Sequence, residues 1–139
     1  MGYLIDTCIW VDVERGALAP ADIADHTKNE PVFISPITLA ELKFGAEITQ
    51  QPDLKQKRLA AVHRLMNKPI LRIDEATGII FGTLAAALKK TGRGHEFRIQ
   101  DLWMASQCVQ HNISLITHNL KDFKDIPGLE ILLIGKSQK

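Results

Sequence analysis

Short apolar runs and longer amphipathic segments alternate along this chain. The runs are bounded by polar or turn-forming residues, as buried strands are, and they predict five strands at residues 3–5, 32–34, 70–73, 114–117 and 129–134. Between them apolar residues recur with the helical period, which predicts a helix directly after residue 5 and helices over about 36–49, 54–67, 75–90 and 99–111. Ser35 and Asp74 are expected to cap two of these helices, and Gly92 to end one.

Strands that alternate with helices across short connections indicate a parallel sheet covered by helices on both faces, which is an α/β fold. The chain shows no internal repeat, low-complexity run or linker. We therefore expect a single domain spanning residues 1–139.

Composition narrows the class of protein further. With 45% hydrophobic and 24% charged residues, the chain resembles an average globular domain that needs neither disulfides nor a structural metal. No apolar stretch approaches the ~18 residues of a membrane span, and Asp6 interrupts the first apolar residues, so we expect a cytoplasmic protein with no membrane contact. Cys8 and Cys108 lack metal-type spacing and are expected to be buried thiols without a chemical role.

Charge is sorted along the sequence, although the net charge is only +1. Residues 1–53 carry three basic and nine acidic side chains, residues 54–98 carry ten basic and three acidic ones, and the remainder is balanced. A basic middle segment suits a polyanionic partner, but a solvated helix face rich in lysine and arginine explains it equally well.

Three carboxylates stand where apolar or capping residues would be expected. Asp6 ends the first strand, at the sheet edge where ligands bind in parallel α/β folds, although helix capping explains it equally well. Glu41 interrupts a helical stripe of Ile37, Phe44 and Ile48, so either it is buried and needs a partner, or it lies partly exposed at the edge of the stripe. Asp101 interrupts a second apolar stripe, and interaction with the helix dipole is its competing explanation.

Further polar side chains follow the fourth expected strand: Thr117, Asn119 and Asp122, for which turn formation is the alternative role. In a parallel sheet, Asp6, Asp101 and the 117–122 segment converge at one edge. Crowded carboxylates repel one another, and a hard divalent cation removes that cost. Because the ligands are all oxygens and no histidine or cysteine pair is placed for zinc, the expected cofactor is Mg²⁺ or Mn²⁺.

The sequence resembles the PIN domains, and within them the VapC-like and FitB-like toxins of type II toxin–antitoxin systems. Five blocks carry this resemblance in order: Leu4-Ile5-Asp6-Thr7, Ser35 to Leu42, Ile73 to Ala76, Asp101 to Ala105, and Leu115 to Phe123. It implies a PIN-like three-layer α/β/α fold with a five-stranded parallel sheet, a homodimer, and an antitoxin that fills a groove beside the site and can insert a basic side chain among the carboxylates.

By the same resemblance, Asp6, Glu41 and Asp101 match the three acidic positions that hold Mg²⁺ or Mn²⁺. Asn119 stands where some relatives place a fourth acid, which leaves the binding of a second metal dependent on Asp122. Thr7 and Thr117 match hydroxyl positions that orient ligands or the attacking water.

The chemistry expected of such a site is hydrolysis of RNA phosphodiester bonds by metal-activated water, leaving a 5′-phosphate and a 3′-hydroxyl. Arg93, His95 and Arg98 precede Asp101 and are candidates for holding the RNA backbone, with an ordinary exposed loop as the alternative. Aromatic residues make up only 6% of the chain, which favours a folded or looped RNA over a long stacked single strand.

Two other functions compete with a ribonuclease toxin. One is a non-catalytic PIN-like binding module in a repressor complex, where the antitoxin makes the only contact with DNA. The other is a phospho-acceptor signalling domain, which would need Asp74 as the acceptor and leaves Glu41 without a task.

Overall fold

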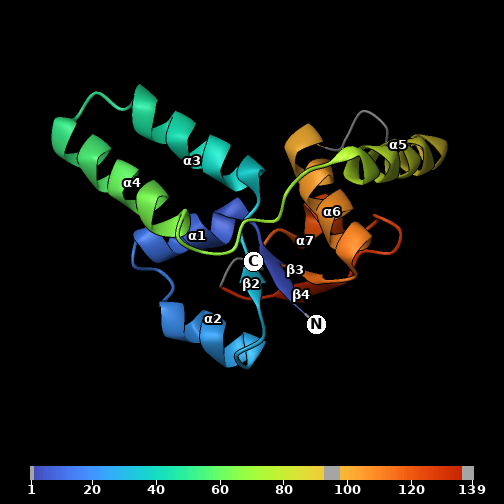
Figure 1. The fold of residues 1–139 in the computed structure, drawn as a ribbon, viewed down its shortest axis with the longest axis horizontal. Helices are drawn as coiled ribbons and strands as arrows, with labels where there is room; N and C mark the ends of the chain where they lie inside the picture. Colours follow the sequence, from blue (N-terminus) through green and yellow to red (C-terminus); the bar gives the residue numbers. More distant parts are fainter. Residues whose placement is uncertain (1, 93–97, 136–139) are drawn as a thin grey trace.

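The computed structural model describes residues 2–92 and 98–135, which form a parallel sheet covered by helices (Figure 1). The sheet has four strands in the order β2-β1-β3-β4, and every neighbouring pair is parallel. The strands are β1 (Tyr3–Ile5), β2 (Val32–Phe33), β3 (Ser114–Thr117) and β4 (Ile131–Leu133). The predicted α/β class and parallel sheet are confirmed.

The fifth expected strand, at residues 70–73, is not formed. Its place at the edge beyond β2 is taken by a single parallel bridge between Ile34 and Ile70. Pro69 has no backbone N–H to donate, and the carbonyls of Leu71 and Arg72 accept from the Gln107 side chain, Leu71 at 2.6 Å and Arg72 at 3.4 Å. With these carbonyls bonded to a side chain, the segment does not extend into a strand.

Seven helices are described: α1 (Thr7–Glu14), α2 (Pro20–Thr27), α3 (Pro36–Ile48), α4 (Pro52–Leu65), α5 (Glu75–Lys90), α6 (Ile99–His111) and α7 (Leu120–Phe123). The sequence pattern missed α2 and α7. The signal for α2 was available, because Pro20 opens the helix and Asp22 Oδ2 accepts from the Ala19 backbone N–H at 3.0 Å. Within the described part of the chain, no helix combines the length and hydrophobicity that crossing a bilayer requires.

The central strands send alternate side chains to two separate cores. Leu4 and Leu115 are fully buried against α5, α6 and α7, whereas Ile5 and Ile116 are fully buried against α1 and α2. Figure 1 shows α3 and α4 as a pair on one side of the molecule and α5 and α6 as a pair on the other. The sheet is thus the middle layer of three, as expected.

Buried polar contacts connect α3 to α6. Ser35 caps α3 as predicted, accepting from the Ile37 N–H at 3.1 Å, and its hydroxyl donates to Gln107 Oε1 at 2.6 Å. One turn further along α3, the Thr38 hydroxyl lies 3.7 Å from Met104 Sδ. Since an unsatisfied buried polar group costs about 1–3 kcal/mol, these contacts fix how the two helices approach each other.

Candidate active site

Asp6 lies at the carboxyl end of β1 and is only 4% exposed. It occupies the N-cap position of α1, but its side chain makes no capping hydrogen bond. Instead, Oδ2 accepts from the Thr117 hydroxyl at 2.8 Å, and Thr117 Oγ1 accepts from the Asn119 backbone N–H at 3.0 Å. The carboxylate is therefore held by the end of β3, and helix capping does not account for its side chain.

Cys8 is a part of this network that the sequence reasoning missed. Its thiol donates to Asp6 Oδ2 at 3.3 Å and lies 3.5 Å from the Thr117 hydroxyl. Burial, followed by the negative charge of Asp6, raises the pKa of the Cys8 thiol to about 12. The residue thus stays a protonated donor to Asp6. Its position two residues after a candidate ligand was the only sequence signal for this role.

Glu41 projects from α3 toward the start of α1. Its Oε1 accepts from the Thr7 hydroxyl at 2.6 Å, and that hydroxyl also lies 3.0 Å from Thr38 Oγ1. The expectation that Glu41 interrupts a buried stripe was wrong, because Phe44 and Ile48 are 64% and 62% exposed. Glu41 itself is partly exposed, with 24% of its side chain accessible, as the alternative interpretation required.

Asp101 is the most electrostatically unusual of the carboxylates. It lies in the first turn of α6, is 5% exposed, and its Oδ2 is buried without a hydrogen-bond partner. Burial raises its pKa to about 7; Arg98 opposes that rise, and the negative charges of Asp6, Asp122 and Glu41 add to it. The fold therefore brings the four predicted carboxylates into one electrostatic neighbourhood, although they come from four different elements.

The segment after β3 supplies the last of these groups. Asn119 precedes α7, and its side chain makes no capping hydrogen bond, while Asp122 lies in the first turn of that helix. His118 is directed to another partner, since its Nε2 lies 3.0 Å from Asp12 Oδ2. The Asp122 carboxylate is thus the only one of these three side chains with a described electrostatic effect on Asp101.

Arg98 is the one candidate RNA-binding residue that the structure describes; Arg93 and His95 lie outside the described residues. Its guanidinium reaches into the carboxylate group, with Nη2 3.5 Å from Glu41 Oε2 and Nε 3.8 Å from Asp101 Oδ2. The side chain is 56% exposed, so Arg98 stands at the mouth of the site.

These residues fit a hard divalent cation by donor type and by charge. The donors are carboxylate oxygens, and the buried Asp101 Oδ2 has no hydrogen-bond partner. In residues 2–92 and 98–135, however, no group of three or more His, Cys, Asp or Glu side chains is already placed to hold a metal ion. In the described arrangement Arg98 contacts two of the carboxylates. To bind a metal ion, the carboxylates must move closer to one another than they are in this arrangement.

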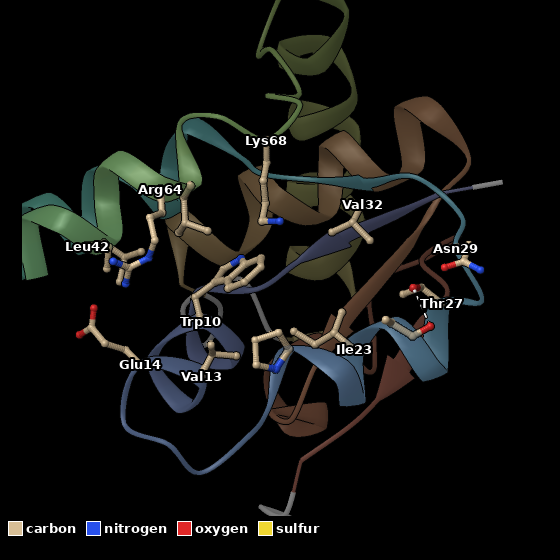
Figure 2. A pocket seen from close by; sticks show the side chains of 14 residues that line it. Trp10, Val13, Glu14, Ile23, Thr27, Asn29, Val32, Leu42, Arg64 and Lys68 are labelled. Atoms are coloured by element: carbon tan, nitrogen blue, oxygen red, sulfur yellow. Dashed lines mark hydrogen bonds between the residues drawn. The ribbon is translucent and has the colours of Figure 1, made fainter.

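Two neighbouring grooves lie on this part of the surface, and one of them includes Glu41. The site groove, of about 320 Å³, has Thr7 and Glu41 in its lining together with the basic residues Arg15, Lys57 and Arg58. The apolar groove, of about 440 Å³, runs between α1, α2 and α4 (Figure 2), and the residues that line it include Trp10, Val13, Ile23, Val32, Leu42 and Leu65. Leu42 lines both grooves, so the two are neighbours on the surface.

The strand order, the helices on both faces and the acidic residues at the carboxyl edge define a three-layer α/β domain with an acidic site, and comparison with known proteins gives its family. The sequence matches the PIN domain over residues 3–129, and the chain belongs to the PIN-domain family. The resemblance found from the sequence blocks is confirmed.

Relatives of this chain include VapC proteins. The chain is 30% identical to Ribonuclease VapC1 of Rickettsia felis over 136 residues, which cover 97% of this chain and 98% of the relative. Among solved structures it is similar to VapBC2 from Rickettsia felis bound to a promoter DNA fragment, with a TM-score of 0.82, 26% identity, and coverage of 96% and 98%. It is also similar to VapBC-1 from nontypeable Haemophilus influenzae, with a TM-score of 0.79, 31% identity, and coverage of 95% and 97%.

Proposed function

We propose that this chain is a ribonuclease toxin that hydrolyses RNA with the help of Mg²⁺ or Mn²⁺. The observation that carries the proposal is the convergence of Asp6, Glu41, Asp101 and Asp122 around a buried carboxylate oxygen that lacks a hydrogen-bond partner. The relatives' description as VapC ribonucleases supports RNA as the substrate class. The proposal places the chain in the cytoplasm, where its substrate is.

In this proposal Asp6, Glu41 and Asp101 hold the cation, with Asp122 or Asn119 as a further ligand. The bound cation would supply a water of lowered pKa and neutralise charge on the phosphate. The residues of the chain do the positioning: Thr117 and Cys8 orient Asp6, and Thr7 orients Glu41. A carboxylate of the site takes the proton of the attacking water.

Basic side chains that could bind the RNA backbone lie beside these carboxylates. Arg15, Lys57 and Arg58 line the site groove together with Thr7 and Glu41, and Arg98 contacts Glu41. Phosphate contacts of this kind position a nucleic acid without reading its sequence. We therefore assign the RNA backbone to the site groove, and Arg93 and His95 remain candidates for additional contacts.

The test is cleavage of a structured RNA by the purified chain with Mg²⁺, with Mn²⁺ and with excess EDTA. We expect cleavage only with a divalent cation, and ends that ligate as 5′-phosphates, because water and not the ribose 2′-hydroxyl attacks. Cleavage in EDTA, or 2′,3′-cyclic ends, would contradict the proposed mechanism. Failure to cleave under any condition favours the second function below.

The second candidate is a non-catalytic binding module that acts with an antitoxin on DNA. Two observations favour it: no metal-ready group exists in the described residues, and a similar structure is a VapBC assembly on promoter DNA. The binding module predicts no uptake of Mn²⁺ that depends on Glu41, whereas the ribonuclease requires it.

An antitoxin is the protein partner we propose for the apolar groove. VapBC proteins form toxin–antitoxin systems, and the similar structures are complexes of this kind. A groove lined by apolar side chains and flanked by the site groove suits a peptide segment that buries apolar residues and ends near the carboxylates. Any contact with DNA is then made through the antitoxin.

We also propose a homodimer, supported by large apolar side chains that the described structure leaves uncovered. Ile79 on α5 is 74% exposed, and Phe44 and Ile48 on α3 are 64% and 62% exposed. Exposed apolar groups of this size are typical of interaction surfaces. We expect light scattering to give twice the monomer mass, and Ile79→Glu to give the monomer mass; an unchanged mass for this variant would exclude α5 from the interface.

A further inference from the structure

Arg98 contacts two carboxylates of the site, which binding to the RNA backbone alone would not require. Its guanidinium bridges Glu41 on α3 and Asp101 on α6, at 3.5 and 3.8 Å. These two carboxylates repel each other: burial raises the pKa of Asp101, and the negative charge of Glu41 adds to that rise. In the metal-free chain, Arg98 therefore supplies part of the positive charge that a divalent cation would supply.

The contacts of the Arg98 guanidinium with Glu41 and Asp101 are long, and the guanidinium is exposed. Both distances exceed the 2.7–2.9 Å typical of charge-assisted hydrogen bonds, and Asp101 Oδ2 remains without a hydrogen-bond partner. The side chain is 56% exposed, whereas the backbone is fixed because the Arg98 carbonyl accepts from the Leu102 N–H at 3.0 Å. The guanidinium can thus leave without unfolding the start of α6.

We propose that Arg98 is a built-in competitor of the divalent cation: it holds Glu41 and Asp101 in the metal-free chain and leaves them when the cation binds. The inference rests on the proposed function and goes beyond it, because it assigns an exchange to a residue of this chain. It also accounts for the absence of a metal-ready group among the described side chains, since Glu41 and Asp101 share an arginine where they would share a metal.

Calorimetric titration with Mn²⁺ tests the competition. We expect Arg98→Ala and Arg98→Gln to bind Mn²⁺ about fivefold more tightly than the wild type, a factor that corresponds to the loss of two weak ion pairs made by a half-exposed arginine. Arg72→Ala is the matched control, because Arg72 is an exposed arginine in the same basic segment, and its affinity should equal that of the wild type. Unchanged or weaker binding by both Arg98 variants would overturn the proposal.

A second measurement separates displacement from a general effect of charge. The Nε–H resonance of Arg98 is assigned by its absence from the Arg98→Gln spectrum and is followed during titration with Mg²⁺. We expect it to move to the position of a solvated arginine at saturating Mg²⁺. A resonance that does not move, in a chain that binds Mg²⁺, would overturn the inference and leave the proposed function intact. A wild-type chain that binds no cation would overturn both.

Discussion

Replacing Asp101 by asparagine is expected to reduce metal-dependent RNA cleavage by about a thousandfold or more, the scale at which removal of a principal charge-stabilising group affects a hydrolase. Asp101 is central to the site, because it is buried, has an oxygen without a hydrogen bond, and has a pKa that the charges of the other three carboxylates raise further. Initial cleavage rates and Mn²⁺ calorimetry on the same samples measure the effect. Full activity in this variant would remove Asp101 from the active site.

The control for this prediction is stability in EDTA. The folded-state pKa of Asp101, about 7, lies above its ordinary value of 3.8, so the folded chain binds more protons than the unfolded chain between these values. The metal-free wild type should therefore lose stability as pH rises from about 4 to about 7. Asp101→Asn lacks this loss and should unfold at a higher temperature than the wild type at pH 8. A variant that is less stable there would make its lost activity uninformative.

Truncation of Trp10 to alanine is expected to weaken antitoxin binding by about 30-fold or more, because large aromatic side chains at the centre of a groove contribute most of the binding energy. Trp10 extends from α1 into the apolar groove, with the Lys68 ammonium 5.8 Å from its ring (Figure 2). Its indole N–H is buried without a hydrogen-bond partner. Titration of the purified antitoxin into each variant measures the affinity.

The chain's other tryptophan provides the matched control. Trp103 stacks on Phe81, with ring centroids 4.3 Å apart, and does not line the apolar groove. Trp103→Ala should keep the antitoxin affinity of the wild type, and Trp10→Ala should keep its RNA cleavage. Equal losses of affinity in the two variants would indicate general destabilisation and would exclude Trp10 as a specific contact.

The sequence predicted those elements whose ends are marked by side-chain chemistry. Residues 3–5, 99–111 and 114–117 have the expected boundaries, and Ser35 and Asp74 cap their helices as expected. The segment at 70–73 failed because its pairing depends on Gln107, a residue more than thirty positions away. Apolar periodicity does not report such competition for backbone carbonyls.

The sequence predicted which carboxylates form the candidate site, but not how buried Glu41 is or which side chains contact it. Asp6 follows β1, Asp122 lies in the helix after β3, and Asp101 lies at the start of α6, so a parallel sheet was expected to bring them to one edge and charge at those positions was informative. The stripe around Glu41 misled, because periodicity identifies a helix face but does not show whether another element covers it. The contact of Arg98 with Glu41 was not predictable, since it depends on how closely α3 approaches α6.

The contacts of Ser35 and Thr38 with α6 have a consequence for how the site adapts. They join the two helices that carry Glu41 and Asp101 through the core, so a movement of one helix against the other would break buried contacts. Tightening around an ion must come from side-chain rotamers, and the reach of an aspartate or a glutamate then sets the size of ion that fits. The helices therefore keep their positions, and the carboxylate side chains adjust to the ion.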